Sequence, residues 1–87
     1  MPKIQEIPLT KIRRPLPRQI DNNKVETLME SITKEGLREP IEVLEVEGKY
    51  YGFSGCHRFE AHRRLGKETI KCRVRKASPS VLRLHLA

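Results

Sequence analysis

This 87-residue sequence has no long apolar segment and no cysteine-rich pattern. No apolar run approaches the ~20 residues that a helix needs to cross a bilayer. The N-terminus lacks the apolar stretch of a signal peptide, and the two cysteines, Cys56 and Cys72, form no CxxC pair. These absences argue against a membrane-spanning protein and a small disulfide-stapled scaffold. We therefore expect a soluble intracellular protein whose two cysteines are free thiols.

The sequence also lacks internal repeats and low-complexity tracts, and its length suits a single domain over residues 1–87. Apolar residues make up 37% and recur with clear periods, which argues against disorder. The net charge of +7 predicts either a solvated basic surface or a polyanionic partner, such as nucleic acid, nucleotide phosphates or an acidic protein. Because no long exposed apolar stripe remains after a core is assigned, we expect a monomer.

Periodicity predicts an α+β fold in the order β-α-β-β-α-β-α, with a mixed sheet packed against helices. The strongest helical signal lies between Asp21, a good N-cap, and Gly36, a good residue just past a helix end. Pro15 and Pro17 favour an extended segment before that helix. The expected elements are a strand over residues 3–9, a helix within 21–36, a hairpin over 40–53 with its turn at 47–48, a helix over 56–66, a strand over 68–76 and a short helix after 78.

The two cysteines fall in different contexts. Cys72 alternates with Ile70 and Val74 on the apolar face of a strand, which predicts an inert core thiol. Cys56, in "FSGCHRFEA", lies where a strand passes into a helix, and a helix N-terminus favours an anion. Arg58 follows two residues later, and Arg14 could reach the thiol if the first loop folds over it. On chemistry alone these conditions leave two interpretations equally open, a nucleophilic thiolate and a packed structural cysteine.

The same junction suits a phosphate group. Gly55 allows close backbone approach, and the next three residues, Cys56, His57 and Arg58, present N–H groups at a helix start. The junction is not a P-loop, because no GxxxxGK[ST] motif is present.

A zinc site is the third possibility for this cysteine. It would need about four ligands, and Cys56, His57, His62 and Cys72 are available. Cys72 faces the core, however, and two histidines five residues apart diverge on a helix. We therefore expect no metal site.

The first long helix carries a polar stripe of Lys24, Thr27 and Ser31 beside its apolar face. Periodicity alone predicts ordinary surface residues there.

The segment "FSGCHRFEAHRRLG", preceded by "IRRPLP" and "DNNKVETLMESI", closely resembles the sulfiredoxin family. The similarity runs from about Ile7 to the last helix and is greatest to the cyanobacterial and plant branch. It implies ATP-dependent reduction of cysteine sulfinic acid in over-oxidised 2-Cys peroxiredoxins. It also implies a cytoplasmic location, or the chloroplast stroma if a transit peptide has been removed.

The resemblance assigns roles to individual residues. Cys56 would be the catalytic cysteine and Arg14 would keep it a thiolate. Magnesium would be carried by the ATP phosphates, and an external thiol such as glutathione or thioredoxin would complete the reduction. Glu42 stands where other members carry Asp. The implied ATP-binding residues are Lys24, Thr27, Ser31, Gly55, His57 and Arg58, and the implied peroxiredoxin-facing residues are Pro15, Leu16, Pro17 and Phe53.

The fold also resembles the N-terminal domain of ParB-type partition proteins, which binds DNA and nucleotide. This second resemblance implies DNA binding as an alternative function. There a "GERR"-like box opens the corresponding helix, whereas this chain has "GCHR", which favours redox chemistry. Weak non-specific binding of nucleic acid remains a second possibility, with a solvated basic face as its alternative. The basic residues that could contact a phosphodiester backbone are Arg63, Arg64, Lys67, Lys71, Arg73, Arg75 and Lys76.

Overall fold

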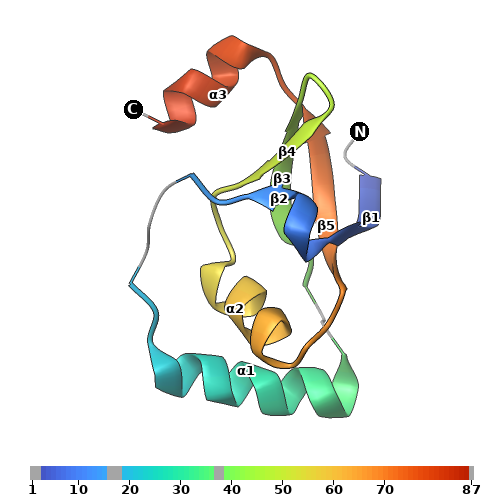
Figure 1. Ribbon diagram of the computed structural model, residues 1–87, viewed down its shortest axis with the longest axis vertical. Coiled ribbons are helices and arrows are strands. Elements are labelled where there is room, and N and C mark those ends of the chain that lie inside the picture. The colour runs from blue at the N-terminus through green and yellow to red at the C-terminus, as the bar shows by residue number, and fades with distance from the viewer. Residues whose placement is uncertain (1–2, 16–18, 37–38, 87) are drawn as a thin grey trace.

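The computed structural model describes residues 3–15, 19–36 and 39–86. Within these ranges five strands form one mixed sheet in the order β1-β5-β3-β4-β2 (Figure 1). The predicted α+β class and the mixed sheet are confirmed. The elements are β1 (Lys3–Pro8), the 3₁₀ helix η1 (Leu9–Lys11), β2 (Ile12–Arg13), α1 (Asn22–Glu35), β3 (Ile41–Val46), β4 (Lys49–Gly52), α2 (Cys56–Arg64), β5 (Thr69–Lys76) and α3 (Pro79–Leu86).

Strand β5 lies between an antiparallel neighbour, β1, and a parallel neighbour, β3. Strands β3 and β4 form the predicted hairpin. Strand β2 was not predicted as a strand. It has two residues, Ile12 and Arg13, which pair in parallel with Tyr50 and Tyr51 of β4. A strand this short carries no alternating pattern, so its place in the sheet depends on the long-range partner rather than on local sequence.

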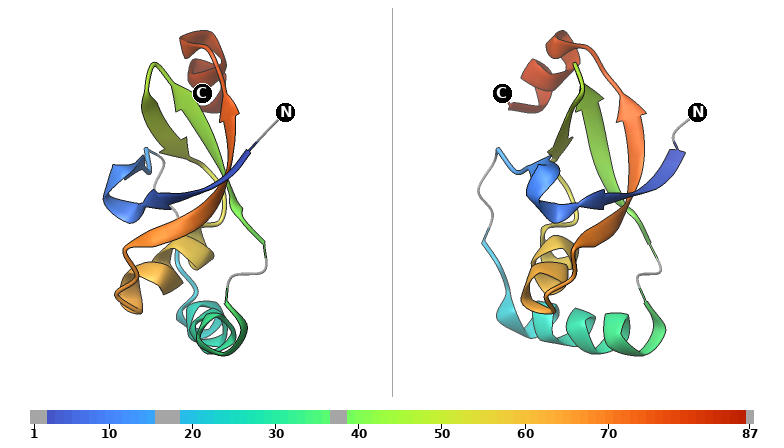
Figure 2. Two further views of the ribbon diagram at one scale, coloured as in Figure 1. Left: turned by 90° about the vertical axis from the view of Figure 1, so that its right-hand side faces the viewer. Right: turned by 45° about the vertical axis from the view of Figure 1, so that its right-hand side comes forward.

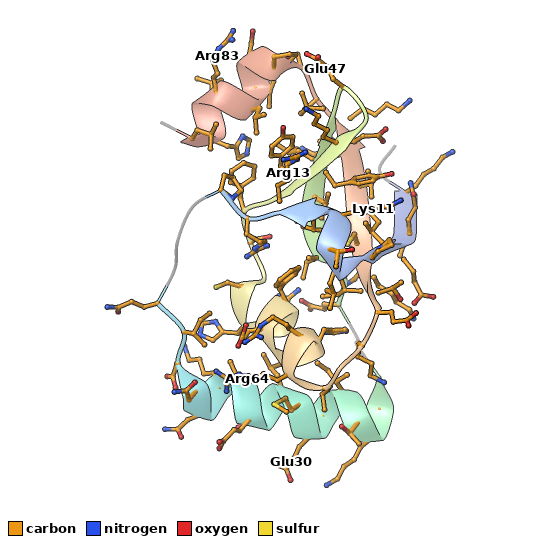
Figure 3. The ribbon with its side chains drawn as sticks, in the orientation of Figure 1. Lys11, Arg13, Glu30, Glu47, Arg64 and Arg83 are labelled. Atoms are coloured by element: carbon orange, nitrogen blue, oxygen red, sulfur yellow. The ribbon has the colours of Figure 1, made fainter. Side chains whose placement is uncertain are left out.

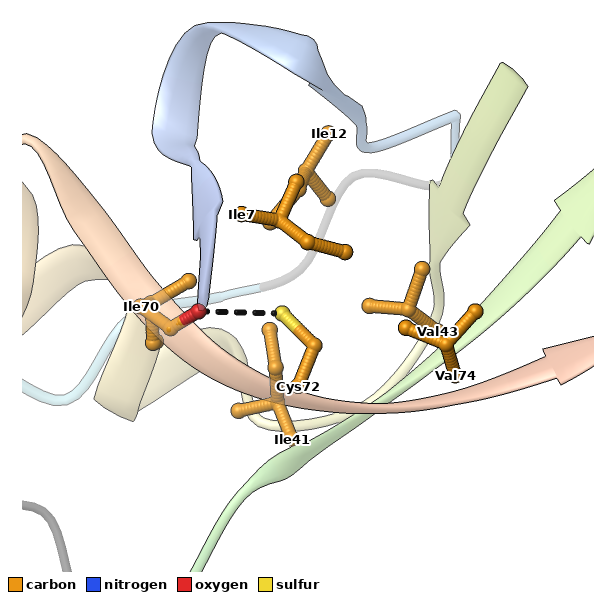
Figure 4. Close-up of a cluster of buried hydrophobic side chains, with 7 residues drawn as sticks. All are labelled: Ile7, Ile12, Ile41, Val43, Ile70, Cys72 and Val74. Atoms are coloured by element: carbon orange, nitrogen blue, oxygen red, sulfur yellow. Dashed lines mark hydrogen bonds between the residues drawn. The ribbon is translucent and has the colours of Figure 1, made fainter. Parts of the chain in front are cut away.

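The core of the sheet is built by the predicted alternation along β5. Ile70, Cys72 and Val74 point to one side, where Ile7 and Ile41 meet them (Figure 4). The Cys72 thiol is fully buried and donates to the carbonyl oxygen of Ile70 at 3.3 Å. Burial raises the pKa of Cys72 to about 11, against a smaller opposing effect of the Arg14 charge. Cys72 is therefore the protonated core residue that its strand position predicts.

Helix α1 lies across one end of the molecule, with α2 between it and the sheet (Figures 1 and 2). Asp21 caps α1, since its side chain accepts from the backbone N–H groups of Asn23 and Lys24. Val25 and Ile32 of α1 pack with Ala61 of α2 in a second apolar cluster. The packing of α1 against α2 sets the first turns of the two helices side by side.

Helix α3 lies at the opposite end from α1 (Figure 2). It begins at Pro79 after Ser78, whose hydroxyl accepts from the N–H of Val81 at 3.3 Å. Its His85 ring lies against Phe53 in a tilted arrangement, with centroids 5.1 Å apart and an interplanar angle of 34°. In the described part of the chain, no helix has the length and apolar character that a membrane span requires.

Candidate active site at the start of helix α2

A glycine in the left-handed backbone conformation precedes α2 in the segment that joins it to the sheet. Gly55 is the N-cap residue of the helix, with φ 66° and ψ 31°, and its carbonyl accepts the first helical bond from Phe59 at 2.8 Å. A Cβ atom at this position would overlap Cγ2 of Ile41. Glycine is therefore required here twice, by its backbone angles and by the close approach of β3. The turn presents the free N–H groups of the first turn of α2.

We expect Gly55→Ala to lower the free energy of unfolding by about 2 kcal/mol or more, because strain and overlap add. Gly66→Ala is the matched control, since Gly66 ends the same helix region with φ 72° but has nothing within 4 Å of its Cβ position. Chemical denaturation of both variants measures the difference. Equal losses in the two variants would show that contact with Ile41 contributes nothing.

Arg14 anchors this turn. Its Nη1 donates to the carbonyl oxygen of Ser54 at 2.8 Å, and its guanidinium lies 5.2 Å from the ring centroid of Phe59. The pairing of β2 with β4 brings it there, close enough that a Cβ on Gly52 would lie 2.6 Å from Nη1. Arg14 thus holds the backbone two residues before Cys56. The hydrogen bond to Ser54 is made to a carbonyl oxygen, and the expected effect of Arg14 on the Cys56 thiol stays a prediction.

A cavity of about 600 Å³ opens where the two helices meet. Both first turns contribute to its wall, so two helix N-termini favour negative charge in it. Six predicted site residues lie together here: the N-cap Gly55, three residues of α2 and two of α1. Ser31 lies four residues beyond Thr27 and is not among the lining residues. Asn23 and Leu28 were missed, although each is adjacent in sequence to a predicted residue. The lining residues are Asn23, Lys24, Thr27, Leu28, Gly55, Cys56, His57 and Arg58.

The hydrogen bonds around the thiol tie α2 to the start of α1. Cys56 is half-buried, and its Sγ lies 3.7 Å from Nδ1 of His57. The backbone N–H of Asp21 donates to Nε2 of the same ring at 3.0 Å. Thr27 donates its hydroxyl hydrogen to the carbonyl of Asn23 at 3.0 Å. The Asp21–His57 contact joins residues 36 positions apart, and no local sequence pattern indicates it.

Arg58 extends from the cavity to the segment before β3. Its Nη1 donates to the carbonyl oxygens of Glu39 at 3.4 Å and Pro40 at 3.2 Å. Its Nη2 lies 3.7 Å from the Glu39 carboxylate. The side chain is about one-third exposed, and Arg58 is also one of the residues that line the cavity.

His62 supports the same helix from inside. It is buried, and its Nδ1 lies 2.8 Å from the carbonyl of Arg58, to which it donates. Burial lowers the pKa of His62, and the hydrogen bond to Arg58 opposes this effect more weakly. In the described ranges, no group of three His, Cys, Asp or Glu residues could hold a metal ion.

We expect acid to destabilise the protein through His62. Its pKa is lowered in the folded state, so the unfolded chain takes up a proton that the folded chain refuses as pH falls below about 6.5. The free energy of unfolding should therefore fall from pH 7 towards 5. A His62→Gln variant should show a shallower fall over that range, and an unchanged slope would contradict the assignment.

Glu60 contributes to stability in a more acidic range. Its pKa is lowered to about 2, chiefly by Arg63, so its contribution to the free energy of unfolding is lost only at lower pH.

Several members of the predicted basic row are engaged with partners. Arg63 and Arg64 both bind the Glu60 carboxylate, and Arg64 also donates to Asn22 at 2.7 Å in the region between α2 and α1 (Figure 3). Arg73 pairs with Glu42 at 2.9 Å. The carboxylates of Glu60 and Glu42 therefore offset part of the positive charge of the row.

The structure describes two of the four predicted partner-facing residues, Phe53 and Pro15. Phe53 and His85 line a second cavity of about 340 Å³. Pro15 is exposed, and the remaining two members, Leu16 and Pro17, lie outside the described residues. Phe53 is three residues from Cys56, so a protein docked there would lie close to the thiol. The other lining residues are Glu42, Val43, Leu44, Ser54 and Arg75.

Comparison with known proteins agrees with this geometry. The model of the ParB N-terminal domain family matches residues 1–87. The chloroplastic/mitochondrial sulfiredoxin of Arabidopsis thaliana is 59% identical over 87 residues, which cover 98% of this chain and 70% of that protein. The crystal structure of Arabidopsis thaliana sulfiredoxin superposes with a TM-score of 0.96 at 58% identity and covers 99% of both chains.

A second solved structure with this fold is the truncated ParB of Caulobacter crescentus complexed with CTP-γ-S. It superposes with a TM-score of 0.74 at 27% identity, covering 97% of this chain and 51% of ParB. The Arabidopsis thaliana sulfiredoxin has the higher sequence identity to this chain, and each of the two chains covers nearly all of the other. The chain therefore belongs to the sulfiredoxin family of enzymes, on a fold that it shares with the ParB N-terminal domain.

Proposed function

We propose that this chain reduces cysteine sulfinic acid in an over-oxidised 2-Cys peroxiredoxin, with ATP as co-substrate and Cys56 as nucleophile. The observation that carries the proposal is the position of Cys56. Cys56 lies on the wall of a cavity that is also lined by the N-termini of α1 and α2 and by two basic residues, Lys24 and Arg58. A nucleophile and a set of phosphate-binding donors in one cavity suit a reaction that needs both.

The nucleotide would lie between α1 and α2. The first turn of α2, from Gly55 to Arg58, would bind phosphate oxygens through its backbone N–H groups, that of His57 included, and through the Arg58 side chain. Lys24 and Thr27 would contact the nucleotide from α1. Ser31 would contact the part of the nucleotide that extends beyond the cavity. The ParB structure with CTP-γ-S supports a nucleoside triphosphate on this fold.

Phosphate transfer makes the sulfinate reactive. A sulfinate is an anion and a poor electrophile, so a thiolate does not attack it. When a sulfinate oxygen attacks the γ-phosphorus, ADP leaves and a sulfinic phosphoryl ester forms on the peroxiredoxin. Cys56 thiolate then attacks the sulfur and expels inorganic phosphate, which gives a thiosulfinate between the two proteins. An external thiol opens this bond, and further thiol carries the electrons for reduction as it forms a disulfide.

The residues of the cavity would lower the barrier electrostatically. Lys24, Arg58 and the helix N-termini offset the charge of the phosphates and orient the γ-phosphate in line with the incoming oxygen. Magnesium bound to the phosphates needs few protein ligands, so a carboxylate cluster is not required. Glutathione or thioredoxin would serve as the thiol.

The peroxiredoxin would dock over Phe53 and the Pro15–Pro17 segment, so that its sulfinate reaches Cys56. We further propose that the chain acts as a monomer in the cytoplasm or, as the name of the Arabidopsis thaliana relative suggests, in the chloroplast stroma.

The proposal is tested by phosphate release. Sulfinylated peroxiredoxin, added with Mg-ATP and a thiol, should cause release of inorganic phosphate in proportion to the sulfinate present. The thiol form of the same peroxiredoxin is the matched control and should release none. Equal release with both forms would indicate an ATPase unconnected with sulfinate.

Weak nucleic-acid binding remains the second candidate, because the net charge is +7 and a ParB shares the fold. We expect an affinity for DNA that is low and falls steeply with salt. Cys56→Ser should leave that affinity unchanged, since phosphodiester contacts need no thiol. Measurable DNA binding with this steep salt dependence would support the candidate, and no binding even at low salt would exclude it.

A further inference from the structure

Both ring nitrogens of His57 have a partner in the structure. Nε2 accepts from the backbone N–H of Asp21 at 3.0 Å, and Nδ1 lies 3.7 Å from Sγ of Cys56. The ring is half-buried at the cavity wall.

The first contact determines the protonation state of the ring. A backbone N–H can only donate, so Nε2 must offer a lone pair. The imidazole is then neutral, and its single proton lies on Nδ1, the nitrogen that faces Cys56. A hydrogen bond donated to sulfur stabilises the charged form of a thiol.

We propose that His57 holds Cys56 as a thiolate through its Nδ1–H, and that the backbone N–H of Asp21 is the positioning group that selects this tautomer. The proposal rests on the proposed function in that it takes Cys56 to be the nucleophile. It adds a role for His57 that does not depend on phosphate.

The same arrangement couples α1 to the reactive thiol. The Asp21 side chain caps the N–H groups of Asn23 and Lys24, which fixes the orientation of Asp21 at the helix start. A movement of this first turn would therefore alter both Lys24 and the hydrogen bond to His57. The other charges that face the thiol region are Lys24 from α1, Arg58 from α2 and Arg14 behind the Ser54 carbonyl, and the variants below leave all three in place.

The tautomer can be observed directly. Nitrogen-15 NMR of the histidine-labelled protein at neutral pH should show His57 neutral and protonated on Nδ1. Asp21→Pro removes the backbone N–H, and the Asp21 φ of −86° is near that of proline. In this variant the His57 signals should move towards the Nε2–H form or its mixture with Nδ1–H. Protonation of the parent protein on Nε2 would overturn the proposal.

The effect on the thiol is measured by alkylation of Cys56 with iodoacetamide, followed by peptide mapping against pH. His57→Leu should slow alkylation at neutral pH by roughly threefold to tenfold, while the limiting rate at high pH stays the same. His57→Asn restores a donor near Nδ1 and should recover much of the lost rate. Alkylation of His57→Leu at the parent rate throughout would overturn the proposal.

Asp21→Pro and Asp21→Ala form a matched pair. Both lose the capping carboxylate, but the alanine variant keeps the backbone N–H. Asp21→Pro should therefore be alkylated more slowly than Asp21→Ala at neutral pH, and equal rates would contradict the role of the N–H. A thermal melt of each variant confirms that it is folded. These measurements use neither ATP nor peroxiredoxin, so their outcome is separate from success or failure of sulfinate repair.

Discussion

Replacing Cys56 with serine should reduce sulfinate repair by at least ~10³-fold and leave ATP affinity nearly unchanged. The hydroxyl of serine is not ionised at neutral pH, and no residue in the cavity replaces the thiolate. The groups that would bind phosphate from α2, its first backbone N–H groups and the Arg58 side chain, stay in place in this variant. Single-turnover repair and titration of a fluorescent ATP analogue measure the two effects separately.

Cys72→Ala is the control for Cys56→Ser. Its thiol is buried in the sheet core with a pKa raised to about 11, so it should not take part in repair. The folded fraction of Cys72→Ala should therefore retain repair, although the variant loses stability because a core cavity forms. Repair by Cys56→Ser at a rate near that of the parent would show that the nucleophile lies elsewhere.

Lys24→Met should lower kcat/KM for ATP by about 10²-fold, because it removes a fixed positive charge from the side of the cavity facing α2. Methionine keeps the length and helix propensity of lysine, so the fold should persist. Lys34→Met, an exposed position near the end of the same helix, is the matched control. Equal, small effects of the two substitutions would place the triphosphate away from α1.

Local sequence was sufficient for α1 and β5. The helix has a capping aspartate, a regular apolar stripe and a terminal glycine, and β5 alternates strictly, so each carries its own signal. The junction at Gly55 was equally visible, because a strand ends and a helix begins there. Cys56, His57 and Arg58 were predicted as candidates from this position alone.

The parts that local sequence could not predict depend on residues far apart in the chain. Strand β2 exists because β4 offers Ile12 and Arg13 a parallel partner. The contact of Arg14 with Ser54 crosses 40 residues, and that of Asp21 with His57 crosses 36. The roles of Lys24 and Thr27 came from the family resemblance, since periodicity favoured an ordinary surface. The structure brings both of these residues, though not Ser31, to the wall that carries Cys56.

The most direct test of the account is intact mass spectrometry of a sulfinylated 2-Cys peroxiredoxin incubated with this protein, Mg-ATP and a thiol. The account predicts that the peroxiredoxin loses both sulfinate oxygens, and that the loss requires ATP and fails with Cys56→Ser. An unchanged mass with several sulfinylated peroxiredoxins, under conditions in which the protein is folded and binds ATP, would contradict the proposed activity.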